Sequence, residues 1–366
     1  MVDKPDCKLP TSLFLPANPE RKGEGGLRTK GYFKHSYKRV GKNWHICDTE
    51  GNPVFLCPSD IVTQISSYID ALKKRELSSV LDPNSISEIP LVSIVTVVKN
   101  AKNWIKNTIL SVVNQNYPNI EYIIIDGNST DGTRDILMDY DRFVDYWISE
   151  TDNGIYDAMN KGTFLSTGRW LLYLNAGDFL YSDRVIEKIV TFKYANSTID
   201  EASEALIYGD WVSFFSGYSF LFRPLHLKNL RTRMCFAHSA CLFKSEVVKK
   251  YGYQTNYLIA SDYELIRHLW SRGYKFVYAN TVISCVNCQD GLSQSFVWTG
   301  FKERLRIASA QEKKSLPNTF LRYFIMDFFS AIFSKVFRFD LFGSRTSPIF
   351  RYLIRRLRYG QTHPSC

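Results

Sequence analysis

Residues 169–178 read R-W-L-L-Y-L-N-A-G-D, and this stretch decides the fold class. The unbroken apolar and aromatic run from Trp170 to Leu174 is typical of a strand that is covered on both faces of a parallel sheet. The run ends in N-A-G-D, so the strand brings the carboxylate of Asp178 to the edge where open α/β sheets bind ligands. Turn chemistry explains the same residues, because Asn and Gly accept left-handed backbone angles and Asp caps helices. The preceding sequence decides between the two interpretations.

A strand, a helix and a second strand are predicted upstream of this stretch. They span residues 91–98 (L-V-S-I-V-T-V-V), 104–114 and 120–125 (I-E-Y-I-I-I). Such a βαβ unit has a right-handed crossover, so Lys99-Asn100 and Asp126 are expected side by side at the strand ends. An acidic residue at the end of the second strand can accept hydrogen bonds from a nucleoside. The first turn, K-N-A-K-N, contains neither glycine-rich phosphate motif, so we expect a metal ion to hold a pyrophosphate.

The same alternation of strands and helices continues beyond residue 140. A short strand over 143–149, a helix from 155, a helix over 184–192 and strands near 205–208 and 211–222 are predicted. The pattern favours an α/β fold with a mostly parallel sheet.

Charge and composition divide the 366 residues into three regions. The formal net charge is +10, but residues 301–366 hold 13 basic and 4 acidic side chains, which makes +9 of the total. The basic character therefore belongs to the C-terminal region and does not indicate a nucleic-acid groove. We predict an accessory extension over 1–89, an α/β domain over 90–300 and a basic amphipathic helical region over 301–366.

The accessory extension divides into three predicted segments. Residues 1–30 have the Pro, Gly and charge content of a loop or a disordered segment. Residues 31–55 alternate aromatic and polar residues around D-T-E-G-N and predict short strands in a hairpin. Ser59 and Asp60 can cap a helix running to about Ser79. The N-terminus lacks an apolar signal core and the eight Cys show no repeated metal-type pairing, so we expect a cytoplasmic, reduced protein.

Four segments together resemble a known family. They are V-S-I-V-T-V-V-K-N (92–100), I-I-I-D-G-N-S-T-D-G-T (123–133), S-E-T-D-N-G-I-Y-D-A-M-N-K-G (149–162) and L-N-A-G-D (174–178). In order and spacing they resemble the inverting family 2 glycosyltransferases of the GT-A fold, a Rossmann-like fold with a mostly parallel central sheet. The segment I-Y-D-A-M-N-K-G is similar to bacterial enzymes that make capsule, exopolysaccharide or lipopolysaccharide. The resemblance implies a nucleotide-sugar donor, most often UDP-linked, and a hydroxyl acceptor on a glycan or polyprenyl-linked sugar.

The resemblance also implies roles for individual residues. The donor-binding residues would be Thr96, Val98 and Asn100 around the nucleoside, Asp126 on the base, Asp131 in the same loop, and Asn160 and Lys161 near the sugar and diphosphate. His238, in C-F-A-H-S-A-C-L-F, matches a position beside the acceptor or diphosphate, and a structural histidine is the alternative.

The metal motif of the family is usually D-x-D. Here Asn175 and Gly177 occupy its first acidic positions, which leaves Asp178 as the carboxylate of the site. Mg²⁺ or Mn²⁺ commonly takes one or two protein carboxylates and completes its shell of about six oxygens from phosphates and water. Asp178 with a diphosphate and water could therefore suffice.

The predicted general base is Asp262, in I-A-S-D-Y-E-L-I-R-H-L (259–269). An inverting transfer requires a base to take the proton of the acceptor hydroxyl. An Asp in a first helical turn also stabilises the helix dipole without catalysis, which is the alternative. Glu264 is the rival base; two residues on, it points away from Asp262 and is expected to be solvated.

Two apolar segments lie in the basic C-terminal region. Residues 320–339 are interrupted by charges, so they cannot span a bilayer, which takes about 20 apolar residues. Residues 350–358 carry an apolar stripe beside Arg351, Arg355 and Arg358, typical of a helix on anionic lipid. A helix packed on the catalytic domain is the alternative. We expect peripheral contact with the inner face of the cell membrane.

Two other functions remain open from the sequence. The altered metal motif is compatible with a non-catalytic subunit that binds nucleotide sugars. A sugar nucleotidyltransferase has a similar architecture, but its glycine-rich basic first loop is missing at Lys99-Asn100-Ala101.

Overall fold

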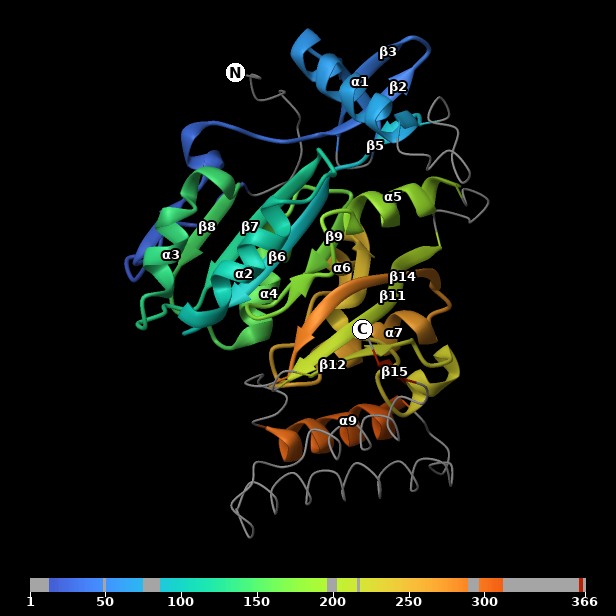
Figure 1. Cartoon of the computed structure of the whole chain (residues 1–366). Coiled ribbons are helices and arrows are strands. Elements are labelled where there is room, and N and C mark those ends of the chain that lie inside the picture. The colour runs from blue at the N-terminus through green and yellow to red at the C-terminus, as the bar shows by residue number, and fades with distance from the viewer. Residues whose placement is uncertain are drawn as a thin grey trace.

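The computed structural model describes residues 13–48, 51–74, 86–195, 203–215, 218–288, 296–311 and 362–364. Its main body is an 11-stranded sheet in the order β1-β8-β7-β6-β9-β13-β11-β12-β15, with β14 beside β11 and β10 beside β14 (Figure 1). These strands are β1 (Gly23–Gly25), β6 (Val92–Val98), β7 (Ile120–Asp126), β8 (Tyr146–Ser149), β9 (Trp170–Tyr173), β10 (Phe179–Leu180), β11 (Glu204–Phe215), β12 (Tyr218–Phe222), β13 (Cys241–Lys244), β14 (Lys275–Asn287) and β15 (Thr362–Pro364).

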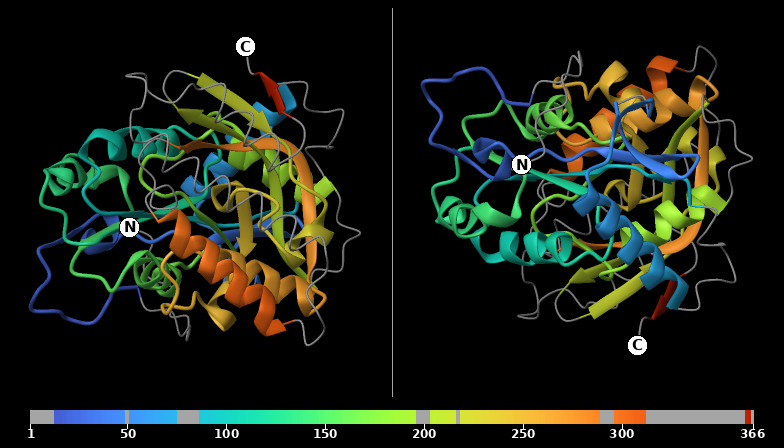
Figure 2. Two further views of the ribbon diagram at one scale, coloured as in Figure 1. Left: turned by 90° about the horizontal axis from the view of Figure 1, so that it is seen from below. Right: turned by 90° about the horizontal axis from the view of Figure 1, so that it is seen from above.

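The helices connect these strands and cover the sheet. They are α2 (Lys102–Val113), α3 (Thr133–Asp139), α4 (Ile155–Leu165), α5 (Val185–Ala195), α6 (Ser245–Tyr251), α7 (Ser261–Ser271) and α9 (Val297–Gln311), with 3-10 turns η1 (Leu27–Lys30), η4 (Asp141–Phe143), η5 (Leu227–Arg231) and η6 (His238–Ala240). Figure 2 shows α2 and α3 on one face of the parallel strands and α4 on the other.

The parallel half of the sheet confirms the predicted α/β fold. Strands β8, β7, β6 and β9 run parallel, and Val98 pairs with Asp126 in the β6–β7 register. Every residue of β6 and β7 is buried, because helices cover both faces. The predicted elements over 91–98, 104–114 and 120–125 are all present, with ends shifted by up to two residues. Their carboxyl ends form one edge, which carries the predicted site.

The other half of the sheet is mixed, and one prediction there was wrong. The two strands predicted near 205–208 and 211–222 are a continuous β11 followed by β12. Gly209, between the two predicted strands, lies inside β11, where an added Cβ would come within 2.4 Å of the Thr281 carbonyl oxygen. The glycine therefore permits the close approach of β14 at an irregular point of the register, and it makes no turn.

A second, four-stranded sheet lies at the opposite end of the parallel strands from their carboxyl edge (Figure 1). It contains β4 (Pro53–Leu56), β3 (Asn43–Cys47), β2 (Ser36–Val40) and β5 (Glu88–Ile89), and α1 (Ser59–Lys74) follows β4. The predicted hairpin and helix are confirmed, although residues 75–79 of the predicted helix lie outside the described residues. Because β5 leads directly into β6, this sheet is at the amino ends of the parallel strands.

The prediction of a loop over residues 1–30 was wrong for residues 23–30, while residues 1–12 lie outside the described range. Strand β1 pairs antiparallel with the edge strand β8, and the segment 13–30 is called here the N-terminal strap. Its glycines let the backbone lie against Trp147, since a Cβ on Gly23 would come within 2.9 Å of that ring. The Pro, Gly and charge content that predicted a loop therefore serves close packing and buried ion pairing.

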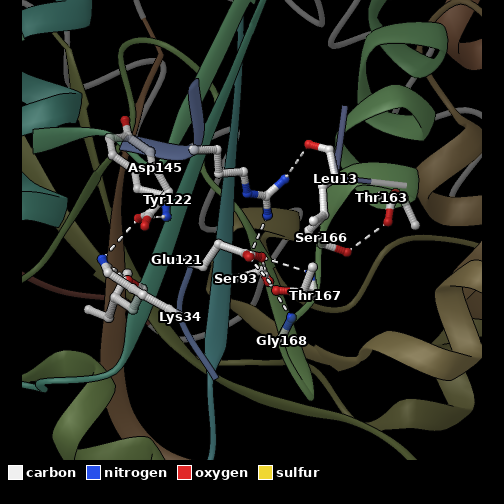
Figure 3. Close-up of polar contacts among 12 residues, drawn as sticks. Leu13, Lys34, Ser93, Glu121, Tyr122, Asp145, Thr163, Ser166, Thr167 and Gly168 are labelled. Carbon is white, nitrogen blue, oxygen red and sulfur yellow. Dashed lines mark hydrogen bonds and ion pairs between the residues drawn. The ribbon is translucent and has the colours of Figure 1, made fainter. Parts of the chain in front are cut away.

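A buried ion pair fixes the end of the N-terminal strap. Arg28 Nη2 donates to Glu121 Oε1 over 2.5 Å, and both side chains are almost fully buried. Figure 3 shows the Glu121 carboxylate between Ser93 and Thr167, whose hydroxyls donate to it. Burial would raise the pKa of Glu121, but the Arg28 charge and these hydrogen bonds hold it below its usual range.

The two apolar segments of the C-terminal region, residues 320–339 and 350–358, lie outside the described residues. Of the described helices, none is both long enough and apolar enough to cross a bilayer.

Candidate active site

The loop after β7 is held together by its own side chains. Asp126 is fully buried, and its carboxylate accepts hydrogen bonds from the Ser129 N–H (3.0 Å), the Ser129 hydroxyl and the Ser149 hydroxyl (2.6 Å). Asn100, with a positive φ of 52°, bonds Ser129 and Thr130 through its N–H and its side-chain oxygen. The predicted pair at the ends of β6 and β7 is thus one hydrogen-bonded unit, and base binding by Asp126 stays a prediction.

Asp131 joins the same unit from the start of α3. Its carboxylate accepts bonds from the Lys102 N–H (2.9 Å) and from the N–H and hydroxyl of Thr133. Partial burial opposes ionisation, but these hydrogen bonds lower the pKa of Asp131. The carboxylate therefore stays ionised beside the start of α2.

Two predicted nucleoside contacts lie inside the sheet. Thr96 is fully buried with its hydroxyl 3.0 Å from the Tyr122 hydroxyl, and Val98 is 5% exposed. Lys99 and Asn100, by contrast, are exposed at the end of β6. A nucleoside contact by Thr96 or Val98 remains a prediction.

Asp178 lies in the turn after β9 and is 9% exposed. Its Oδ1 accepts from the Asn287 N–H at the end of β14 (2.9 Å), and the Ser239 hydroxyl from η6 also donates to the carboxylate. Burial raises the pKa of Asp178 to about 7, although both hydrogen bonds lower it. Gly177 has a φ of 101°, so a glycine at this position of the turn avoids the strain a side chain would bring.

The residues around Asp178 fit a divalent cation of the Mg²⁺ or Mn²⁺ type. Asn175, three residues earlier, has a buried side-chain oxygen that lacks a hydrogen-bond partner among the described residues. A carboxylate and an amide oxygen are hard ligands of the kind these ions take, with phosphate and water completing the shell. Within the described ranges no group of three or more His, Cys, Asp or Glu could hold a metal. The ion would therefore depend on the substrate for several of its ligands.

Helix α4 presents two different faces to the site. Tyr156 and Asn160, four residues apart, lie on one face. The Asn160 amide donates to the Tyr253 carbonyl oxygen and accepts from the Tyr253 N–H, each over 2.8 Å. Lys161 donates to Glu150 Oε1 (2.8 Å) and to the Thr151 carbonyl oxygen (3.1 Å). Donor contacts by Asn160 and Lys161 stay predictions, and both side chains already have partners in the chain.

Asp262 lies in the first turn of α7, as predicted. Its Oδ1 accepts from the Tyr156 hydroxyl (3.2 Å) and from the Tyr263 N–H (2.8 Å). Glu264, the rival base, is half-buried where solvation was expected, and burial raises its pKa. Its expected solvation was therefore wrong in part, because α7 packs into the domain at this end.

His238 lies in η6 and packs against two tyrosines of the site. Its Nε2 lies 2.8 Å from the Tyr253 hydroxyl, and its ring stacks on Tyr173 at 5.1 Å between centroids. Burial lowers the pKa of His238, while the charge of Asp262 opposes this shift. Its neighbour Ser239 bonds Asp178. The turn after β9 is therefore joined to the start of α7 through η6, then through Tyr253, which stacks on Tyr156, the donor to Asp262.

These contacts bring several predicted residues to one region. Asp126 and Val98 are register partners, and the Ala176 N–H bonds the Val97 carbonyl oxygen, so the ends of β7, β6 and the turn after β9 are adjacent. Asp178 belongs to this turn, and Asp262 of α7 reaches the region through its hydrogen bond from Tyr156 of α4.

Sequence reasoning missed several partners in this region. Ser239, Tyr253 and Asn287 follow from pairings of distant segments, which no local pattern encodes. Arg21 of the N-terminal strap donates to Glu150 Oε2 (3.1 Å), the same carboxylate that binds Lys161. The spacing of Tyr156 and Asn160 was the one available signal, because it places both on one helix face.

Part of the chain is similar to known glycosyltransferases. The sequence profile described as Glycosyl transferase family 2 matches residues 93–252, which include α4, Asp178 and His238 but end before Asp262. The PGL/p-HBAD biosynthesis glycosyltransferase of Mycobacterium tuberculosis is 29% identical over 232 residues, covering 60% of this chain and 86% of that protein.

Solved structures of low sequence identity are also similar. The mannosyltransferase PcManGT from Pyrobaculum calidifontis, in complex with GDP-Man and Mn²⁺, has a TM-score of 0.49 at 14% identity, over 80% of this chain and 91% of that chain. S. aureus TarS 1-349, in complex with UDP-GlcNAc, has a TM-score of 0.48 at 14% identity, over 69% and 76% of the two chains. By the family profile and the order of the parallel strands, residues 93–252 are similar to a family 2 glycosyltransferase domain of the GT-A fold.

Proposed function

We propose that the chain is an inverting glycosyltransferase of cell-surface polysaccharide synthesis. It moves a sugar from a nucleotide-sugar donor, with UDP as the first candidate, to a hydroxyl of a glycan or polyprenyl-linked acceptor. One observation carries the proposal: Asp262, at the start of α7, accepts from Tyr156, whose ring stacks on Tyr253. The Tyr253 hydroxyl lies against His238 of η6, and the next residue of η6, Ser239, donates to Asp178 at the carboxyl edge of the sheet. In this proposal α7 contributes the base, Asp262, and the turn after β9 contributes the diphosphate site at Asp178.

Asp262 is the proposed general base. Its carboxylate takes the proton of the acceptor hydroxyl, and the oxygen attacks the anomeric carbon from the face opposite the leaving diphosphate. Such proton transfer contributes roughly 10²–10⁴-fold to the rate.

The donor occupies the edge formed by β6, β7 and the turn after β9. Asp126, Asp131 and Asn100 order the loop that faces the nucleoside. Mg²⁺ or Mn²⁺, held by Asp178 with Asn175 nearby, would offset the charge that develops on the leaving diphosphate. Lys161 of α4, whose ammonium lies 2.8 Å from Glu150 Oε1, is the proposed contact to the donor diphosphate.

The test is release of nucleoside diphosphate from a panel of UDP-GlcNAc, UDP-glucose, UDP-galactose and GDP-mannose, with and without Mn²⁺. We expect release from one donor, with the anomeric configuration inverted in any transferred product by NMR. A protein that binds a nucleotide sugar but releases no nucleoside diphosphate would instead fit the non-catalytic subunit. That alternative is suggested by Asn175 and Gly177 at the acidic positions of the metal motif. Release of pyrophosphate from NTP and a sugar phosphate would indicate the nucleotidyltransferase.

We further propose that the protein is cytoplasmic and peripheral on the inner face of the cell membrane. The support is the +9 charge of residues 301–366 and the Arg stripe of residues 350–358. Each Lys or Arg near an anionic surface contributes about 1 kcal/mol to binding. Sedimentation with anionic vesicles should fall sharply for a chain ending at residue 315, and equal sedimentation of both chains would contradict the proposal.

A further inference from the structure

The carboxylate of Asp262 is held asymmetrically. Two donors, the Tyr156 hydroxyl and the Tyr263 N–H, both reach Oδ1, at 3.2 Å and 2.8 Å. Within the described residues no hydrogen bond reaches the second oxygen, Oδ2. One oxygen therefore fixes the rotamer of the side chain, and the other keeps its lone pairs for a further partner.

We propose that Tyr156 is a positioning residue for the general base: its hydroxyl holds Oδ1 of Asp262 so that Oδ2 is aimed at the acceptor hydroxyl. The proposal rests on the function proposed above, in which Asp262 takes the acceptor proton. Tyr156 acts through Asp262 and touches neither substrate. A base held in one rotamer reaches the reactive geometry more often than a freely rotating one.

Tyr156 is itself rigid, as a positioning residue must be. It is 5% exposed and stacks on Tyr253, with 5.7 Å between ring centroids and 21° between ring planes. Tyr253 cannot move independently, because the Asn160 amide binds its backbone on both sides and its hydroxyl lies against His238. A single helix, α4, therefore supplies the hydroxyl that holds the base and the amide that holds the ring behind it.

The chemistry of the Tyr156 hydroxyl fits a donor. Burial and the nearby charge of Asp262 raise the pKa of Tyr156 well above its ordinary value, so the phenol keeps its proton at any physiological pH. A buried hydroxyl needs a partner, and Asp262 is the acceptor that the structure provides. Packing alone would be served equally well by phenylalanine at this position.

The test compares Tyr156→Phe with Tyr117→Phe. Tyr117 is also buried and donates to the Pro90 carbonyl oxygen (2.6 Å) at the far end of the parallel strands, so its variant controls for losing a buried hydroxyl. With the donor identified by the panel above, we expect Tyr156→Phe to lower kcat about 10-fold, the effect of one hydrogen bond to a charged group. The KM for the donor and the affinity for UDP with Mn²⁺ should not change, and Tyr117→Phe should keep the wild-type kcat.

A double-mutant cycle separates positioning from general loosening. In the Asp262→Asn background, adding Tyr156→Phe should lower the residual rate by less than about twofold, since residues that act as a unit are not additive. A full further 10-fold loss there, or a wild-type kcat for Tyr156→Phe while Asp262→Asn is inactive, overturns the inference alone. A wild-type rate for Asp262→Asn overturns the base assignment and the inference with it.

Discussion

Asp178 is the residue on which the proposed metal site depends most. Its carboxylate is buried, burial raises its pKa to about 7, and its two hydrogen bonds come from the Asn287 N–H and the Ser239 hydroxyl. Both bonds can form equally well to an amide oxygen. An asparagine would therefore fill the structural role of Asp178, and only the negative charge of Asp178 requires another explanation.

Replacing Asp178 by Asn should separate charge from structure. The amide oxygen can still accept from Asn287, so we expect the thermal unfolding temperature to stay within a few degrees of wild type. The Mn²⁺-dependent affinity for UDP should fall by more than about 10-fold, the loss typical of groups that merely support a ligand. Calorimetric titration with and without Mn²⁺ checks this, and unchanged Mn²⁺-dependent binding would exclude Asp178 as a ligand.

The negative charge of Glu121, unlike that of Asp178, has a structural partner, the guanidinium of Arg28. In the variant Glu121→Gln the buried Arg28 guanidinium loses its counter-charge, which should cost roughly 3–5 kcal/mol of unfolding free energy at pH 7. The pKa of Glu121 in the folded protein is below 4.5, the ordinary value of a glutamate. Ionised Glu121 therefore stabilises the folded state fully above about pH 4.5, and this stabilisation is lost as the pH falls through the folded-state pKa. Urea unfolding at neutral and acid pH should show the gap between variant and wild type narrowing in acid. An equal gap at both values would contradict the assignment.

At the scale of elements, the N-terminal strap shows where sequence reasoning fails. Local patterns predicted β6, α2, β7 and α4 well, because continuous apolar runs and helical spacing are signals contained in one segment. Strand β1 is three residues long, rich in glycine, and forms because β8 offers an unpaired edge. Neither that edge nor the Glu121 partner of Arg28 can be seen from residues 13–30 themselves.

Gly26 of the strap and Gly31, the residue that follows the strap, allow a test of this packing. Gly26 and Gly31 both have positive φ, 98° and 83°, but a Cβ on Gly26 would come within 2.7 Å of the Asp145 carbonyl oxygen, whereas one on Gly31 meets nothing within 4 Å. Gly31→Ala should therefore cost about 1 kcal/mol, from backbone strain alone. Gly26→Ala should cost roughly 3 kcal/mol, because its φ of 98° with ψ of −178° is essentially restricted to glycine and because overpacking is added. Equal losses in urea unfolding would mean that the strap does not pack on β8 as described.

At the scale of the whole molecule, the proposed site is assembled from segments that are far apart in the chain. The carboxyl ends of β6, β7 and β9 supply Asn100, Asp126 and Asp178, and α7 supplies Asp262. The parallel order of these strands could be predicted, so their shared edge could be too. The meeting of α7 with that edge could not, because it depends on η6, Tyr253 and the end of β14.

The assignment of Asp262 as the general base rests on the family resemblance and on the contacts of its carboxylate. Asp262 lies beyond residue 252, where the match to the family profile ends. A direct measurement on this residue therefore tests more than any other substitution in the site.

That measurement is the rate of nucleoside diphosphate release by Asp262→Asn, beside its affinity for UDP with Mn²⁺. The amide keeps the size of the side chain and can still accept from Tyr156 and the Tyr263 N–H, but it cannot take a proton. We predict a rate lower by about 10²–10⁴-fold with unchanged nucleotide affinity. A near-wild-type rate with intact binding would contradict the account.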